Sequence, residues 1–121
     1  MGRVVFVEDD PAIRKLVQVA LRGSSHEVHV ATNGREGFEL VSRLKPDIVF
    51  TDVSMPEMDG MQLADAIRAR ADLAGTRIVF VTASVQRDQI ADYERHGANG
   101  YLAKPFSTKA LREEIARLMP A

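Results

Sequence analysis

The sequence predicts an α/β fold, a doubly wound parallel sheet with helices on both faces. Three short apolar runs of β-branched or aromatic residues, each closed by a polar residue, are typical of strands buried on both faces. They lie at residues 3–8, 47–52 and 77–82, and two weaker strands are expected at Glu27–Ala31 and Gly100–Ala103. Helical patterns separate the runs. Five alternations of strand and helix indicate parallel strands with right-handed crossovers.

The first helix is expected directly after the first strand. Asp10 precedes Pro11, which gives an N-cap residue followed by proline at the first helical position. Apolar residues then recur at the spacing of one helix face. They are Ile13, Leu16, Val17, Ala20 and Leu21.

Three further helices show similar apolar stripes. The second opens at Asn33, the third at Asp59 and Gly60, and the last lies near the C-terminus. Their stripes are Phe38, Val41 and Leu44; Leu63, Ala64 and Ile67; and Leu111, Ile115 and Leu118.

The remaining helical segment, residues 86–96, is different. Ile90, Ala91 and Tyr93 supply its apolar surface, and the other residues are mostly charged or amide. A helix with so narrow a stripe should be the most loosely held of the five.

Length and composition fit one globular domain, residues 1–121. The chain is 45% hydrophobic and 27% charged with a net charge of -1, which excludes a basic surface for nucleic acid or anionic membrane. It contains no cysteine, which excludes disulfides and thiolate chemistry. The apolar N-terminal run is too short for a signal peptide or a membrane span. We expect a soluble, cytoplasmic protein.

Polar residues gather at the C-terminal ends of the predicted strands. Acidic residues end the first and third strands, Thr82 ends the fourth, and Lys104 follows the fifth. In a flavodoxin-like strand order of 2-1-3-4-5, the first and third strands are neighbours about 4.8 Å apart. We therefore expect Asp9, Asp10 and Asp52 to lie within a few ångströms of one another.

Carboxylates that close cannot all stay ionised without a counter-charge, so either some are protonated or a cation binds. At about 5 Å and an effective dielectric near 20, each pair repels by roughly 3 kcal/mol. Oxygen ligands without histidine or cysteine suit Mg²⁺, which keeps coordination positions open for water and a phosphoryl oxygen.

The other polar residues suit phosphoryl chemistry at the same edge. Lys104 supplies a positive charge, Thr82 supplies a hydroxyl, and the carboxylate of Asp52 can act as a nucleophile toward phosphorus. Each residue alone is as easily explained as a helix cap, a turn residue or a solvated lysine. Their coincidence on one edge favours a functional site.

These motifs together resemble the receiver domain of two-component response regulators, and the chain is similar to the single-domain chemotaxis-type regulators. Each motif is short, but the set is specific in this order and spacing, and the resemblance runs over residues 3–119. The motifs lie at residues 7–10, 52–56, 58–60, 82–84 and 100–106.

The resemblance implies a role for each site residue. Asp52 would be phosphorylated; Asp10 and Asp52 would bind Mg²⁺ directly with the backbone carbonyl of Ser54, and Asp9 would act through water. Lys104 would hold a phosphoryl oxygen, and the Lys104–Pro105 bond would be cis. In the switch, Thr82 would move toward the phosphoryl group and Tyr101 would turn inward. Ser54 and Ser84 would tune the lifetime of the phosphoryl group.

The resemblance also implies partners. A sensor histidine kinase or phosphotransfer protein would supply the phosphoryl group, and a downstream effector or covalently linked output domain would respond to it. The face formed by residues 86–96, the fifth strand and the last helix would bind that partner. The protein would be a signalling switch that catalyses its own phosphorylation and dephosphorylation.

Three other functions are compatible with parts of the pattern. A flavodoxin-type electron carrier would need a phosphate-binding loop where the chain instead has Glu8, Asp9 and Asp10. A Mg²⁺-dependent aspartyl phosphatase usually carries a second aspartate two residues after its nucleophile, where this chain has Ser54. A phosphorylation-independent interaction module would not need the intact set of Asp52, Thr82 and Lys104.

Overall fold

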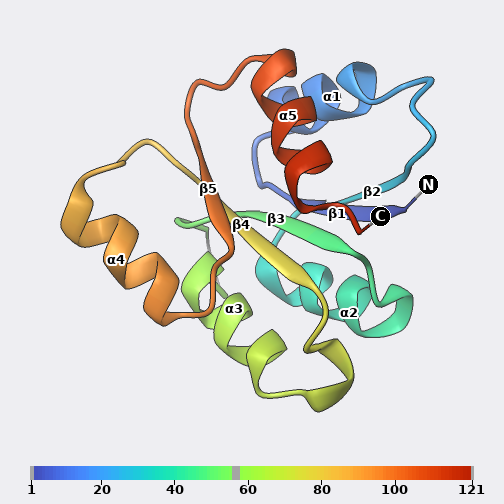
Figure 1. The fold of residues 1–121 in the computed structure, drawn as a ribbon. Coiled ribbons are helices and arrows are strands. Elements are labelled where there is room, and N and C mark those ends of the chain that lie inside the picture. The colour runs from blue at the N-terminus through green and yellow to red at the C-terminus, as the bar shows by residue number, and fades with distance from the viewer. Residues whose placement is uncertain (1, 56–57, 121) are drawn as a thin grey trace.

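The computed structural model describes residues 2–55 and 58–120. Within them, five parallel strands form one sheet in the order β2-β1-β3-β4-β5 (Figure 1), which confirms the predicted fold. The chain crosses from β1 outward to β2, then returns past β1 to continue through β3, β4 and β5. The strands are β1 (Arg3–Val7), β2 (Glu27–Ala31), β3 (Ile48–Asp52), β4 (Arg77–Thr82) and β5 (Gly100–Ala103).

Helices cover both faces of the sheet (Figure 1). The side chains of α1 and α5 pack on one face, and those of α2, α3 and α4 pack on the other. A short 3-10 helix, η1 (Ala71–Leu73), links α3 to β4. The α-helices are α1 (Pro11–Ala20), α2 (Gly34–Leu44), α3 (Gly60–Arg68), α4 (Arg87–Arg95) and α5 (Thr108–Leu118).

The central strands separate two hydrophobic cores because successive side chains of a strand point to opposite faces. On the α1 and α5 face, the rings of Phe6 and Phe50 stack with centroids 5.2 Å apart. On the other face, the ring of Phe80 meets the edge of Tyr93 at 5.2 Å. Strands β1, β3 and β4 thus bury nearly every residue and form a rigid base for the groups that follow them.

Side chains cap several of the helices as the sequence predicts. The carboxylate of Asp10 accepts the N–H of Ala12 at the start of α1, and Asn33 caps α2 in the same way. Asp59 and Gln62 form a reciprocal capping box at α3. Helix α4 begins at Gln86 without a side-chain cap hydrogen bond.

The narrow apolar stripe predicted for residues 86–96 is also observed. Throughout α4, all of which is described, Tyr93 alone is buried. Ile90 and Ala91 are partly exposed.

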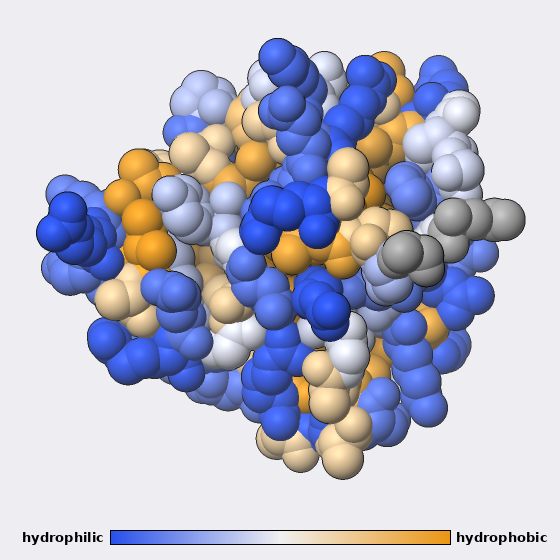
Figure 2. Space-filling model, in the orientation of Figure 1, coloured by the Kyte–Doolittle hydropathy of each residue, from blue (hydrophilic) through white to orange (hydrophobic). Residues whose placement is uncertain are grey.

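On the face shown in Figure 2, hydrophilic residues predominate and hydrophobic residues lie between them in small groups. In the described part of the chain, the large hydrophobic residues that are exposed are Leu16, Val19, Val85 and Tyr101. Across residues 2–55 and 58–120, no helix has the length and apolarity that a bilayer crossing requires.

Candidate functional site

The predicted site residues follow the C-terminal ends of four strands, at one edge of the sheet. Asp52 ends β3 and Thr82 ends β4, while Glu8 and Asp9 follow β1 and Lys104 follows β5. Because β1 and β3 are paired in register, Val7 beside Thr51, the residues that follow them lie next to one another.

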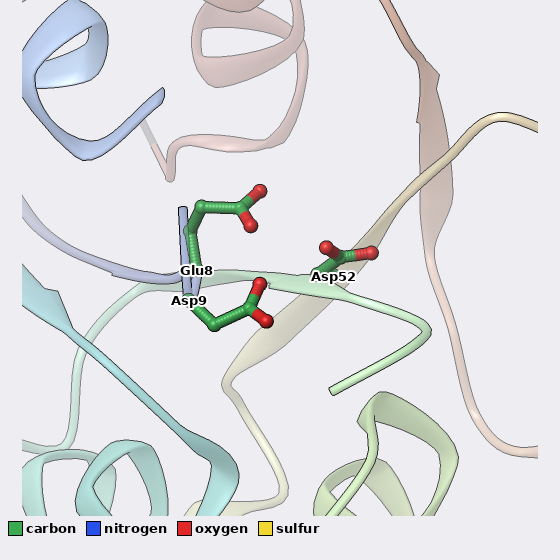
Figure 3. Close-up of side chains that lie close together, drawn as sticks. All are labelled: Glu8, Asp9 and Asp52. Carbon is green, nitrogen blue, oxygen red and sulfur yellow. The ribbon is translucent and has the colours of Figure 1, made fainter. Parts of the chain in front are cut away.

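Three carboxylates gather between the ends of β1 and β3. Ligand oxygens of Glu8, Asp9 and Asp52 all lie within 4.8 Å of one another. Glu8 and Asp9 extend from the end of β1 toward Asp52 (Figure 3). Glu8 is fully buried, Asp52 is 8% exposed, and Asp9 lies at the surface.

The composition of this cluster corrects the prediction in one respect. Glu8 stands where we expected Asp10. The Asp10 carboxylate lies instead at the start of α1, where its Oδ1 accepts the N–H of Ala12 at 2.9 Å. This carboxylate is engaged in capping α1, and it is not a member of the acidic group found among the described residues.

Lys104 is the cation of the site. Its Nζ donates to Oδ2 of Asp52 at 2.8 Å and lies 3.1 Å from Oε1 of Glu8. Burial lowers the pKa of Lys104, but its hydrogen bonds to Asp52 and Glu8 outweigh burial and raise the pKa above its ordinary value. The Lys104–Pro105 peptide bond is cis, as the resemblance implies.

Glu8 is the most strongly perturbed acid at this edge. Burial raises the pKa of its carboxyl from 4.5 to about 7, and the negative charge of Asp52 acts in the same direction. The hydrogen bond from Lys104 opposes this rise without cancelling it. The carboxyl group of Glu8 therefore gains and loses its proton near neutral pH.

Hydroxyl groups occupy the neighbouring end of β4. The Thr82 Oγ1 lies 2.9 Å from the hydroxyl oxygen of Tyr93 and accepts the N–H of Ser84 at 3.0 Å. Thr82 is buried, whereas Tyr101 on β5 is 42% exposed. In this structure the two expected switch residues thus occupy an inward and an outward position, respectively.

Ser54 lies in the loop after β3. It is exposed, and its N–H donates to Oδ1 of Asp52 at 3.3 Å. Asp52 therefore accepts a hydrogen bond on each oxygen, from Ser54 on one and from Lys104 on the other. Pro56 of the same motif lies outside the described residues.

The family model described as the response regulator receiver domain matches residues 4–116. The chain belongs to this family. It is a receiver domain of the kind found in two-component response regulators, as the resemblance predicts.

Relatives of this receiver domain include a probable transcriptional regulator, ycf29, of Porphyra purpurea. That protein is 34% identical over 96% of this chain and 56% of its own length. The transcriptional regulator RpaA of Synechocystis is 31% identical over 98% of this chain and 49% of its own length. The receiver domain thus spans about half the length of the curated relatives it matches.

Solved structures agree with the fold. The chemotaxis response regulator CheY4 of Vibrio cholerae superposes with a TM-score of 0.93 at 29% identity, covering 98% of this chain and 99% of its own. The receiver domain of sensor histidine kinase PA1611 from Pseudomonas aeruginosa superposes with a TM-score of 0.87 at 26% identity, covering 97% and 96%. The PA1611 structure has a magnesium ion coordinated in the active site cleft.

Two residues of the receiver domain site were missed from the sequence. Glu8 belongs to the acidic cluster, and the signal for it was its place at the end of a buried strand. Tyr93 reaches Thr82 from α4, and the signal for it was an aromatic residue with a polar tip on an otherwise polar helix.

Proposed function

We propose that Asp52 is the phosphoacceptor of this receiver domain. The observation that carries the proposal is the placement of its buried carboxylate, held by the Nζ of Lys104 and the N–H of Ser54 beside two further carboxylates. A carboxylate held on both oxygens has a fixed orientation toward an incoming phosphorus atom.

The reaction is a phosphoryl transfer onto an Asp52 oxygen. That oxygen forms the new bond to phosphorus, and the bond from phosphorus to the donor breaks. When the donor is the phosphohistidine of a sensor kinase or phosphotransfer protein, the imidazole leaves and takes up a proton. Hydrolysis of the aspartyl phosphate by water returns the carboxylate and inorganic phosphate.

The acidic cluster fits Mg²⁺. Its donors are carboxylate oxygens from Glu8, Asp9 and Asp52, without histidine or cysteine, which is the set that this hard cation prefers. Asp9 and Asp52 would hold the ion together with the backbone carbonyl of Ser54. Bound Mg²⁺ would supply positive charge for the oxygens of the transferring phosphoryl group. The magnesium in the PA1611 structure supports this assignment.

Asp10 is the remaining member of the predicted metal set. We propose that it acts as the N-cap of α1 in place of a direct ligand, because its carboxylate already accepts the N–H of Ala12. Glu8 takes its place in the cluster and keeps Lys104 near Asp52 through their shared ion pair.

Lys104 and Thr82 complete the site. The ammonium group of Lys104 exchanges its contact with Asp52 for one with a phosphoryl oxygen, and the hydroxyl of Thr82 moves to donate to another. Tyr101, now exposed, turns toward the space that Thr82 leaves. Ser54 and Ser84 flank the phosphoryl group and govern the access of the hydrolytic water.

The output of the switch is a change in the face formed by α4, β5 and α5. The relatives named as transcriptional regulators are about twice as long as this chain. We therefore propose that a downstream effector or a linked output domain responds to this face, and that the receiver domain itself binds neither nucleic acid nor membrane in the cytoplasm.

The test is intact-mass measurement after incubation with acetyl phosphate and Mg²⁺. We expect the mass of one phosphoryl group on the wild type and none on Asp52→Asn, which keeps the side-chain shape but removes the nucleophile. Asp10→Asn is the matched control, and it should still be phosphorylated. An adduct that survives Asp52→Asn would contradict the proposal, and multiple turnover of a phosphomonoester would favour an aspartyl phosphatase.

A further inference from the structure

A buried pair of hydroxyl groups lies at the end of β4. The oxygens of Thr82 and Tyr93 are 2.9 Å apart, and both lie near the carbonyl oxygen of Ser84, at 3.2 Å from Thr82 and 3.1 Å from Tyr93. Within residues 2–55 and 58–120, the Thr82 hydroxyl has hydrogen bonds to Ser84 and Tyr93 and none to Asp52. The hydroxyl is thus engaged away from the phosphoacceptor.

The two hydroxyl protons can be placed in three ways. Thr82 can donate to Tyr93 while Tyr93 donates to the Ser84 carbonyl. Thr82 can donate to that carbonyl while Tyr93 donates to Thr82. Alternatively, both can donate to the carbonyl, which has two lone pairs. The proton of Thr82 is used inside the cluster in every case. Thr82 can donate to a phosphoryl oxygen only after it gives up one of these bonds.

Packing fixes the position of the Tyr93 hydroxyl. The Tyr93 side chain is 4% exposed, and its ring meets Phe80 in an edge-on arrangement with centroids 5.2 Å apart. Phe80 is fully buried in the middle of β4. The hydroxyl therefore reaches Thr82 from a ring that is already held in place.

The same side chain attaches α4 to the body of the protein. Within α4, Tyr93 is the one buried residue, and the helix has no side-chain cap at its start. The hydroxyl that contacts Thr82 and the one buried side chain of α4 thus belong to a single residue.

We propose that Tyr93 is a positioning residue that holds Thr82 in its resting place through the bond between their hydroxyls. This inference rests on the proposed function, in which Thr82 moves toward the phosphoryl group on Asp52. The phosphoryl group and Tyr93 then compete for the Thr82 hydroxyl. Phosphorylation thus removes one of the buried interactions that attach α4, while the packing of the Tyr93 ring on Phe80 remains.

The test compares the wild type with Tyr93→Phe, which removes the hydroxyl and keeps the ring. Beryllofluoride, a phosphoryl mimic, is titrated in the presence of Mg²⁺, and binding is followed by the amide NMR signals of Asp52 and α4. Because a buried hydrogen bond that favours the resting state is lost, we expect about two- to tenfold tighter binding by the variant. A role limited to packing would lower the stability of the protein but leave this affinity unchanged. Unchanged or weaker binding would overturn the proposal.

Two control variants separate the hydroxyl from other effects. In a Thr82→Ala background, Tyr93→Phe should no longer change the affinity, because the partner hydroxyl is absent. Ala91→Gly lowers the helix propensity of α4 without touching the hydroxyl pair and should leave the affinity as in the wild type. An effect of Tyr93→Phe that persists without Thr82, or an equal effect of Ala91→Gly, would refute the assignment.

A second measurement does not depend on phosphoryl chemistry. In the unphosphorylated protein without metal, Tyr93→Phe should speed amide hydrogen exchange throughout α4. Unchanged exchange would count against Tyr93 as the attachment of this helix. If the wild type itself fails to bind beryllofluoride, the proposed function is wrong and the inference falls with it. If the wild type binds beryllofluoride and Tyr93→Phe binds it with the same affinity, the inference about Tyr93 is wrong and the proposed function still stands.

Discussion

Helices α3 and α4 cover the same face of the sheet but are attached to it in different ways. Helix α3 begins with a capping box and buries Gly60, Leu63, Ala64 and Ile67, whereas α4 begins without a side-chain cap and buries Tyr93. Helix α3 also starts close behind Asp52, the proposed phosphoacceptor, since a side chain at Gly60 would collide with the backbone oxygen of Asp52.

The firm attachment of α3 and the weak attachment of α4 suit two different tasks in the site. The carboxylates of Glu8, Asp9 and Asp52 must keep their geometry against mutual repulsion. They lie at the ends of the almost fully buried strands β1 and β3, with α3 packed behind Asp52. In the proposed switch Thr82 moves, and its partner Tyr93 belongs to a helix with little else buried. The three carboxylates thus lie on the firmly packed part of the protein, whereas Thr82 and Tyr93, the pair proposed to separate, are both uncharged.

The largest expected effect tests this difference in attachment directly. Leu63→Ala should lower the free energy of unfolding by about 2–5 kcal/mol, because it leaves a cavity beneath α3. Ile90→Ala in α4 should cost only about 1 kcal/mol, because that side chain is already partly exposed. Urea denaturation of both variants measures the two values. Equal losses would show that α4 is held as firmly as α3.

A smaller effect should appear in the carboxylate cluster when pH is varied without metal. Glu8 has a pKa of about 7 in the folded protein and near 4.5 when unfolded, so the folded state binds more protons between these values. The free energy of unfolding should therefore fall as pH rises, by about 2 kcal/mol from about pH 5.5 to about pH 8. Glu27 and Asp72 have lowered pKa values, and their contribution changes below this window.

Denaturation across this pH range, with Glu8→Gln as the control, checks the assignment. The variant has no carboxyl to titrate at this position, so its stability should vary much less with pH. A slope that survives in Glu8→Gln would locate the titrating group elsewhere.

The smallest effect is expected from a substitution that gives α4 an N-terminal cap like that of α3. The residue three positions after Gln86 is Gln89, so Gln86→Ser should create a capping box like that of Asp59 and Gln62. We expect a gain of about 1 kcal/mol or less in the free energy of unfolding, with slower amide exchange in the first turn of α4. Gln86→Ala, which cannot cap, serves as its pair. If both variants behave alike, the missing cap does not explain the weak attachment.

Most of the fold could be predicted because the strands bury both faces. Such strands appear in the sequence as continuous apolar runs. The predicted limits of the three central strands differ from the observed ones by at most one residue, since β1 ends at Val7 and β3 begins at Ile48. The 3-10 helix Ala71–Leu73 was not predicted, since three residues are too few to show a periodic pattern.

The sequence showed which strands carry the site, but it did not identify every residue in it. Three consecutive acids follow β1, and their acidity alone does not mark which of them enter the cluster. Pro11 was the available clue, because proline at the first helical position makes Asp10 the cap. The bond between Thr82 and Tyr93 joins two elements through tertiary packing, and no local pattern encodes it.

The contact of one ammonium group with two carboxylates has a consequence for how phosphodonors approach. With Glu8 ionised, Lys104 and a divalent ion together balance the charge of Glu8, Asp9 and Asp52. An anionic donor then meets a locally neutral entrance, so its encounter rate should depend little on ionic strength. Without a divalent ion the same groups carry a net negative charge, which would repel an anionic phosphodonor.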